Sequence, residues 1–258
     1  MLKESLRQNG RAFGSMAMEF LTPGLPAIIA ATGAEFALFD MEHTGAGLET
    51  MKTLIAGSRG VGIAPLVRVP RGEYHFIARA LDIGAHGIMV PMVGSAEEAA
   101  HIAACAHYPP AGRRGAGFGI AHDDYRMTDP ATAMARAAAR TLMIAQIETV
   151  EGLEAVEAIA ATPNIDVVWL GHFDLTNFMG IPGQFQHPDY LAAVRRIAAA
   201  AQAHGKVAGI LATNDAWAQE YWRHGYRMIA YGLDHLLFQA ALKAGLEKLR
   251  ALTVPGRP

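Results

Sequence analysis

Short apolar runs that end in polar residues alternate along the chain with alanine-rich segments of helical period. This alternation is typical of parallel strands joined by crossover helices. About eight runs fit the strand pattern, and eight strands close a (β/α)8 TIM barrel in roughly 250 residues. We therefore predict one such barrel, as a single domain over residues 1–258. The predicted strands are Phe13–Met16, Ala37–Asp40, Pro65–Val69, Gly87–Val90, Leu142–Ile147, Val167–Leu170, Val207–Ile210 and Met228–Tyr231.

The alternative arrangement of the same elements is an open, doubly wound sheet. Neither a GxGxxG motif after the first predicted strand nor a Walker motif supports it. A formal net charge of −2 gives no sign of a nucleic-acid partner. Cys105 is the only cysteine, which excludes an internal disulfide framework. A polar N-terminus and the lack of a long apolar run lead us to expect a cytoplasmic protein without a membrane partner.

Two carboxylates follow the fifth and sixth predicted strands, Glu148 and Asp174. The two strands are joined by a helical segment, so we expect them to be parallel and to end on the same side of the sheet. Facing carboxylates repel each other unless a cation lies between them, and the pair therefore predicts a divalent metal site. Two other roles remain open. Glu148 could be a first-turn carboxylate that the dipole of the next helix stabilises, and Asp174 could cap a helix.

Other polar residues follow the remaining strands. Asp40-Met41-Glu42-His43 follows the second strand, Arg68 lies in the third, and Gln146 lies near the end of the fifth. Active sites of (β/α)8 barrels lie at the C-terminal ends of the strands, which makes His43, Arg68 and Gln146 candidates. The less specific interpretations are a surface ion pair of Arg68 with Glu42 and a hydrogen-bonded rim histidine without a catalytic role.

These residues occur within longer motifs that cover most of the chain. In order, they are FALFDMEHTG, PLVRVP, ALDIGAHGIMVPMV, YPPAGRRGAGFG, QIETVEGLEAVEAIAATPNIDVVWLG, FDLTNFMGIPGQFQHP and AGILATN. With these motifs the chain resembles the metal-dependent class II pyruvate aldolases, typified by 2,4-dihydroxyhept-2-enedioate aldolase and 2-keto-3-deoxy-glucarate-type aldolases. The resemblance implies a (β/α)8 barrel, a bound Mg²⁺, Mn²⁺ or Co²⁺ ion, and a homohexamer built as a trimer of dimers.

The resemblance also implies roles for single residues. Glu148 and Asp174 are expected to be the metal ligands, with Asp174 also close to the substrate. Arg68 is expected to contact the keto or enolate oxygen of pyruvate. His43 with Asp82 is expected to be the acid–base pair. For Asp82 the alternatives are a helix cap or turn, or a contact with a neighbouring subunit.

The sequence departs from the family around the second metal ligand. Where the family usually has Gly-Pro-Ala-Asp-Leu, this chain has Gly171-His172-Phe173-Asp174-Leu175. The backbone N–H groups that would hold the pyruvate carboxylate survive this change, whereas the shape of the entrance does not. We therefore expect Phe173 and Gln146 to be substrate-binding residues, with Gln146 a polar neighbour of the metal.

Cleaving a carbon–carbon bond beside a ketone leaves an enolate, whose charge the protein must stabilise. Class I aldolases use a Schiff-base lysine. Of the five lysines here, only Lys206 adjoins a predicted strand, and it does so at the N-terminal end, away from the expected site. A metal acting as Lewis acid is the remaining route. We predict an aldolase that joins pyruvate or hydroxypyruvate to an aldehyde; the alternatives are a citryl- or malyl-CoA-type lyase and a catalytically silent oxoacid- or metal-binding homologue.

Two further segments carry expectations. The glycine-rich segment around Gly112–Gly119 is predicted to close over the site, with Arg113 or Arg114 reaching the far end of the substrate. Asp234–Arg250 has apolar residues at helical spacing. It either packs as a helix on its own barrel or, as the resemblance implies, is exchanged between subunits.

Overall fold

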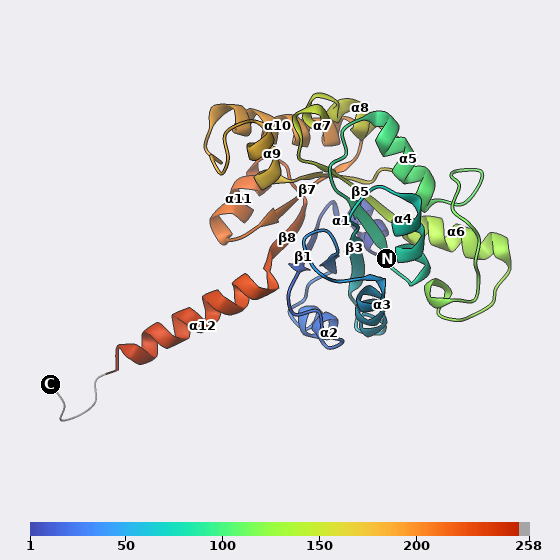
Figure 1. Cartoon of the computed structure of the whole chain (residues 1–258), viewed down its shortest axis with the longest axis horizontal. Coiled ribbons are helices and arrows are strands. Elements are labelled where there is room, and N and C mark those ends of the chain that lie inside the picture. The colour runs from blue at the N-terminus through green and yellow to red at the C-terminus, as the bar shows by residue number, and fades with distance from the viewer. Residues whose placement is uncertain (253–258) are drawn as a thin grey trace.

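A computed structural model of the chain describes residues 1–252. Eight parallel strands form one closed barrel in which each strand pairs with the next and the last pairs with the first (Figure 1). The (β/α)8 fold predicted from the sequence is confirmed, and each observed strand contains or overlaps its predicted counterpart. The strands are β1 Ala12–Ala17, β2 Phe36–Asp40, β3 Ala64–Arg68, β4 Gly87–Val90, β5 Leu142–Ile147, β6 Val167–Leu170, β7 Val207–Ala212 and β8 Met228–Leu233.

Helices connect the strands and surround the barrel (Figure 1). None of the helices in residues 1–252 combines the length and the apolar character needed to cross a bilayer. The helices are α1 Leu2–Asn9, α2 Leu25–Ala30, α3 Leu48–Gly57, α4 Tyr74–Asp82, α5 Ala96–Ala106, α6 Pro130–Arg140, α7 Val150–Glu154, α8 Val156–Ala161, α9 His172–Phe178, α10 Pro188–Ala203, α11 Asp215–Arg223 and α12 Asp234–Arg250, with a short 3₁₀ turn at Ala121–Asp123.

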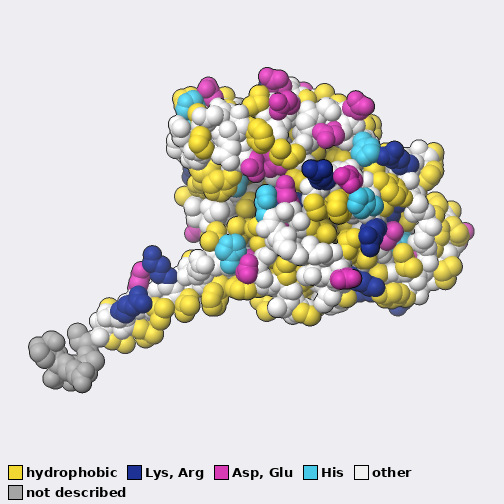
Figure 2. All heavy atoms as spheres, in the orientation of Figure 1, with side chains coloured by type: hydrophobic (Ala, Val, Ile, Leu, Met, Phe, Trp, Pro, Cys, Tyr) yellow, Lys and Arg dark blue, Asp and Glu magenta, His cyan; other side chains and the backbone are white. Residues whose placement is uncertain are grey.

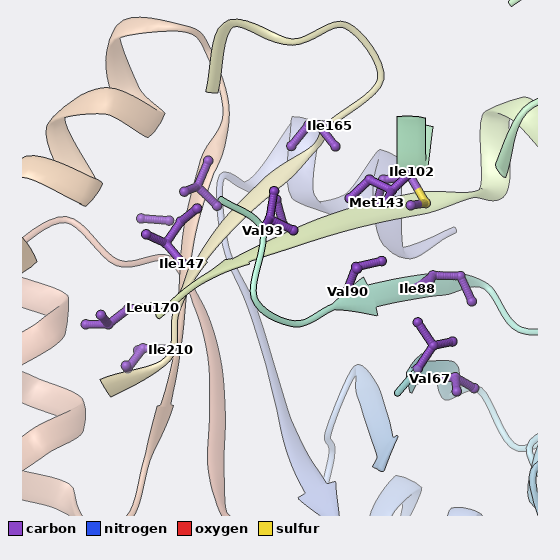
Figure 3. Packing of buried hydrophobic residues seen from close by; sticks show 14 of the residues in the cluster. Val67, Ile88, Val90, Val93, Ile102, Met143, Ile147, Ile165, Leu170 and Ile210 are labelled. Atoms are coloured by element: carbon purple, nitrogen blue, oxygen red, sulfur yellow. The ribbon is translucent and has the colours of Figure 1, made fainter. Parts of the chain in front are cut away.

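Alternation along each strand divides the apolar side chains into two clusters. One cluster fills the space between strands and helices, and Figure 3 shows part of it, including Val67, Met143 and Ile147. The other fills the inside of the barrel, where Trp169 is the largest side chain. Gly209 makes room for that ring, because a Cβ at this position would overlap the indole.

The N-terminal end of the barrel is closed by α1. Lys3 on this helix is 6% exposed, and its Nζ donates to Asp166 Oδ2 and to the carbonyl of Thr141, each at 2.9 Å. Asp166 also accepts from the backbone N–H of Met143 at 3.0 Å. This ion pair joins α1 to the segments that lead into β5 and β6.

The last helix, α12, extends away from the barrel (Figure 1). Its first residue, Asp234, accepts hydrogen bonds from the backbone N–H groups of Met18, Glu19 and Phe20 at 2.7–3.1 Å. Burial alone would raise the pKa of Asp234, but these bonds outweigh it and the pKa is lowered. Beyond this anchor, apolar side chains gather along one edge of the helix (Figure 2). Leu242 of this helix is 49% exposed.

Candidate active site

Strand alternation aims a row of polar side chains into the mouth of the barrel. Phe36 and Leu38 of β2 point inside, so Asp40, two residues further, points the same way. On β3, Leu66 points inside the barrel, so Arg68, two residues further, also points inside. Asp40 and Arg68 are also direct partners in the β2–β3 register. Residues from neighbouring strands therefore meet at the C-terminal rim.

Arg68 is held between two carboxylates. It is 7% exposed, its Nε donates to Asp40 Oδ1 at 2.5 Å, and its Nη1 lies 3.0 Å from Glu42 Oε2. Asp40 is fully buried and also accepts from the backbone N–H of His43 at 2.9 Å. These contacts fix the plane of the guanidinium.

Glu148 follows β5 and is 1% exposed. Its Oε1 accepts from the backbone N–H of Met92 at 2.7 Å, and its Oε2 accepts from Gln146 Nε2. Met92 has φ 58°, a left-handed conformation that is rare for a residue with a side chain, and this turn directs its N–H at the carboxylate. Gly171 lies so close that a Cβ there would overlap Glu148 Oε2.

Burial raises the pKa of Glu148 to about 7. The Met92 hydrogen bond opposes this shift, whereas the negative charges of Glu42 and Asp174 reinforce it. Burial also raises the pKa of Glu42, against the positive charges of Arg68 and His43. The carboxylates at this rim thus repel one another, and Arg68 alone does not neutralise them.

Asp174 lies in the first turn of α9 and not at its cap, which is Gly171. Helix α9 therefore starts earlier than a cap at Asp174 would require. Asp174 lines a cavity of about 210 Å³ together with His43, Arg68 and Gln146. Asp174 and Glu148 thus lie at the same rim, as parallel strand ends predict, and the charge of Asp174 acts on Glu148.

The donors at this rim fit a hard divalent cation. Glu148 and Asp174 supply carboxylate oxygens, and the buried Gln146 Oε1 has no hydrogen-bond partner among the described residues. Oxygen donors of this kind suit Mg²⁺ and Mn²⁺. In residues 1–252 no three His, Cys, Asp or Glu side chains gather as a metal cage. A cation held here would keep coordination positions for a substrate.

The chain resembles known proteins over most of its length. The family model described as HpcH/HpaI aldolase/citrate lyase matches residues 20–241. The chain is 38% identical over 232 residues to a hydroxypyruvate/pyruvate aldolase of Chromohalobacter salexigens, covering 87% of this chain and 88% of the relative. It belongs to the HpcH/HpaI aldolase/citrate lyase family.

Other members of the HpcH/HpaI family are similarly related. A 5-keto-4-deoxy-D-glucarate aldolase of Salmonella arizonae is 35% identical over 228 residues, which cover 88% of this chain and 87% of the relative. A solved structure of an HpcH/HpaI aldolase from Desulfitobacterium hafniense superposes with a TM-score of 0.92 at 30% identity, covering 100% of this chain and 99% of that one. The suspected aldolase family is confirmed, over nearly the whole length.

The expected pairing of His43 with Asp82 does not form within one chain of this HpcH/HpaI family member. Helix α4 leads into β4, so its last residue, Asp82, lies at the N-terminal end of the barrel, whereas His43 lies at the other end. Asp82 Oδ1 accepts instead from Arg114 Nη2 at 2.7 Å. The His43 imidazole is 54% exposed, and its Nε2 lies 3.7 Å from Glu42 Oε2.

The glycine-rich segment is also at the N-terminal end. It follows α5, and the carbonyl of Ala121 in its last part accepts from Arg59 Nη2 at 2.5 Å. Arg114 is 2% exposed and holds Asp82. The expectation that this segment closes over the cavity of its own chain is not met in the structure, because no residue of Gly112–Gly119 lines that cavity.

Sequence reasoning missed the roles of Asp40 and Met92, and gave Glu42 only as a partner for Arg68. Alternation within Phe36–Asp40 was the available signal for Asp40, because it puts the carboxylate on the same face as Phe36 and Leu38. The turn at Met92 has no comparable signal, since nothing in Pro91-Met92 indicates a positive φ.

His172, where this chain departs from the family motif, is buried in an aromatic cluster. Its ring lies 4.7 Å from the ring of Phe173, 5.7 Å from Phe185 and 5.2 Å from Trp217. Burial lowers the pKa of His172 to about 4, so the imidazole is neutral. Phe173 is 55% exposed beside the cavity, and the cluster behind it fixes its position.

Proposed function

We propose that this protein is a divalent-metal-dependent aldolase that reversibly cleaves 4-hydroxy-2-oxoacids to pyruvate, or hydroxypyruvate, and an aldehyde. One observation carries the proposal: in a member of an aldolase family, a buried guanidinium, an amide and a carboxylate line a single cavity at the C-terminal rim. Its volume of about 210 Å³ is below the roughly 300–1,000 Å³ of pockets for drug-sized ligands and suits a small oxoacid.

Glu148 and Asp174 would hold the Mg²⁺, Mn²⁺ or Co²⁺ ion, with Gln146 beside it. A bound dication would act as a Lewis acid on the keto group of the oxoacid. The backbone N–H groups in the first turn of α9, at Phe173 and Asp174, have no partner within the helix and are available to the substrate carboxylate.

Arg68 would stabilise the negative charge that develops on the keto oxygen. Its Nε and Nη1 are used by Asp40 and Glu42, which leaves further N–H donors of the guanidinium for the substrate. Because Arg68 is buried and held in place, it needs no rearrangement when the charge develops, and such preorganised donors contribute about 3 kcal/mol.

His43 would take the proton from the C4 hydroxyl in cleavage and return it in synthesis, since histidine side chains exchange protons near neutral pH. The exposed ring of Phe173 would contact the aldehyde. Asp82 lies too far from His43 of its own chain to form the acid–base pair, so its catalytic role requires a second copy of the chain.

Assembly into a homohexamer, a trimer of dimers, would supply that copy. The apolar edge of α12 supports assembly, because Phe238, Leu242 and Leu249 are 56%, 49% and 62% exposed on one chain. We propose that α12 docks on a neighbouring subunit. Sedimentation of Leu242→Asp would show a smaller particle than the wild type, whereas an unchanged sedimentation coefficient would contradict the docking of α12.

The reaction is tested by measuring pyruvate release from 5-keto-4-deoxy-D-glucarate before EDTA, after EDTA, and after Mn²⁺ is restored. We expect EDTA to abolish release and Mn²⁺ to restore it. Activity that EDTA leaves unchanged would exclude the metal mechanism. Release only from citryl- or malyl-CoA would favour the CoA-type lyase, and no turnover of either substrate class would favour a silent homologue.

A further inference from the structure

A second cavity lies at the other end of the barrel. Its volume is about 780 Å³, and it lies beneath the N-terminal ends of β2, β3 and β4. The first residues of α1, the turn at Ala121–Asp123 and the end of α6 form its other walls. The charged and titratable side chains among its lining residues are Glu35, Arg59, His86, Asp124 and Arg140.

Arg140, the last residue of α6, brings an uncompensated positive charge to this cavity. Its Nε is buried and has no hydrogen-bond partner, and no ion pair joins its side chain to any residue between 1 and 252. A buried N–H group without a hydrogen-bond partner is destabilising. Burial lowers the pKa of Arg140, and the nearby charge of Arg114 lowers it further, against the opposing charges of Asp124 and Asp123.

Arg59 faces the same space and is only partly neutralised. One of its N–H groups donates to the carbonyl of Ala121, and its Nε lies 3.6 Å from Asp124 Oδ1. The Asp124 side chain is 68% exposed, so its attraction is screened by water.

The remaining carboxylates nearby already have partners. Glu35 accepts from the backbone N–H of Phe13 at 2.9 Å and lies 3.4 Å from Ser5 Oγ. Asp123 lies 3.1 Å from His122 Nδ1 and accepts from the backbone N–H of Gly119 at 3.0 Å. Neither lies within ion-pair distance of Arg140, so the positive charge of Arg140 has no salt-bridge partner among residues 1–252.

His86 lies close to the same guanidinium groups. Burial lowers its pKa to about 4, and the charges of Arg140 and Arg59 act in the same direction, against Asp124. The ring is therefore neutral near pH 7 and can donate one N–H to a ligand.

We propose that this cavity binds a small oxyanion, the phosphate or carboxylate group of a metabolite, between Arg59 and Arg140. Planar guanidinium groups bind phosphate and carboxylate oxygens in pairs, and two of them around one cavity make a site for such a group. The neutral His86 provides an additional donor. This site is separate from the cavity at the C-terminal rim and does not depend on the aldolase activity.

Calorimetric titration of the full-length protein with inorganic phosphate, and separately with citrate, tests the proposal. We expect saturable binding of at least one of the two anions. Binding should be at least about tenfold weaker in Arg140→Gln and in Arg59→Gln, since losing one bidentate contact removes about 1.4 kcal/mol or more. Saturation by phosphate alone identifies a phosphate site, and saturation by citrate alone a carboxylate site.

Arg136→Gln is the matched control, because Arg136 is on the same helix, is exposed, and does not line the cavity. It should bind the anion within twofold of the wild type. Arg140→Lys keeps the charge but not the paired donors, and it should fold and bind with intermediate affinity. The proposal is overturned if Arg140→Gln or Arg140→Lys retains wild-type affinity, or if neither anion gives saturable binding.

Discussion

The two ends of this barrel differ in the sign of the charge they leave unpaired. At the C-terminal rim, the carboxylates of Asp40, Glu42, Glu148 and Asp174 face the single cation Arg68. At the N-terminal end, guanidinium groups line a cavity whose neighbouring carboxylates are exposed or already have partners. Unpaired charge that is shielded from water points to a ligand of opposite sign, so we expect a dication at one end and an oxyanion at the other.

The two ends also differ in the expected role of their buried ion pairs. Lys3 and Asp166, at the N-terminal end, form a pair that joins elements distant in sequence, so we expect it to contribute to stability. Arg68 and Asp40 also form a buried ion pair, but Arg68 lines the C-terminal cavity. We therefore expect this second pair to contribute to turnover. Variants at the two ends should therefore change different measured quantities.

The largest effect is expected from His43→Ala. Loss of a general acid–base group lowers the rate by about 10²–10⁴-fold, and we expect kcat for pyruvate release to fall by about that factor. Mn²⁺ binding should be unchanged, because His43 is not among the proposed ligands. His75→Ala removes an exposed histidine of α4 and serves as the control. A near-normal kcat in His43→Ala would remove His43 from the mechanism.

At the opposite end, Lys3→Met should lower the free energy of unfolding by about 3 kcal/mol, because Asp166 loses its buried partner. Turnover per folded molecule should not change. Urea denaturation with a parallel rate assay measures both, and Lys52→Met provides an exposed control. If this variant lost turnover but not stability, the proposed division between the two ends would be wrong.

His86 gives the N-terminal end a pH dependence. Its pKa in the folded protein is about 4, below the ordinary 6.5, so the unfolded chain binds more protons between these values. Stability from this group is therefore present above pH 6.5 and is lost as the pH falls toward 4. With the charges of Arg140, Arg59 and the opposing Asp124 unchanged, the difference between the two pKa values corresponds to about 3 kcal/mol of stability.

Urea denaturation at pH 4–7, in buffers free of phosphate and polycarboxylates, should show a flatter pH profile for His86→Gln than for the wild type. His75→Gln, at an exposed site, should keep the wild-type slope. Identical profiles for His86→Gln and the wild type would mean that the His86 ring is not held neutral.

The smallest effect is expected at the mouth of the C-terminal cavity. Phe173→Ala should lower kcat/KM for aldehydes with an apolar or aromatic substituent about tenfold, as expected when about 1.4 kcal/mol of contact is lost. Phe178→Ala is the matched control, because Phe178 is on the same helix and is 51% exposed. Equal losses in both variants would show that Phe173 has no specific contact with the aldehyde.

The periodicity of apolar residues predicted the fold well because the same periodicity decides which side chains are buried in the core. Alternation in segments such as Leu142–Ile147 decides both which side chains fill the barrel and which polar groups reach its rim. The convergence of Glu148 and Asp174 follows from parallel strand direction alone. For this reason the strands, and the rim at which both carboxylates lie, are predictable from the sequence.

Other features depend on geometry that periodicity does not encode. The separation of Asp82 from His43 follows from the direction of α4, and the position of the glycine-rich segment from the direction of α5. The left-handed turn at Met92 depends on its contact with Glu148. A resemblance in sequence motifs indicates which residues form a site. It does not indicate whether one chain or two chains supply them.

The most direct test of the account is a titration of the metal-free protein with Mn²⁺, followed by electron paramagnetic resonance. We predict one Mn²⁺ per chain in the wild type and in His43→Ala, and affinity weaker by at least about 100-fold in Glu148→Gln and in Asp174→Asn. If both carboxylate variants bound Mn²⁺ with the affinity and stoichiometry of the wild type, the proposed metal centre would be contradicted.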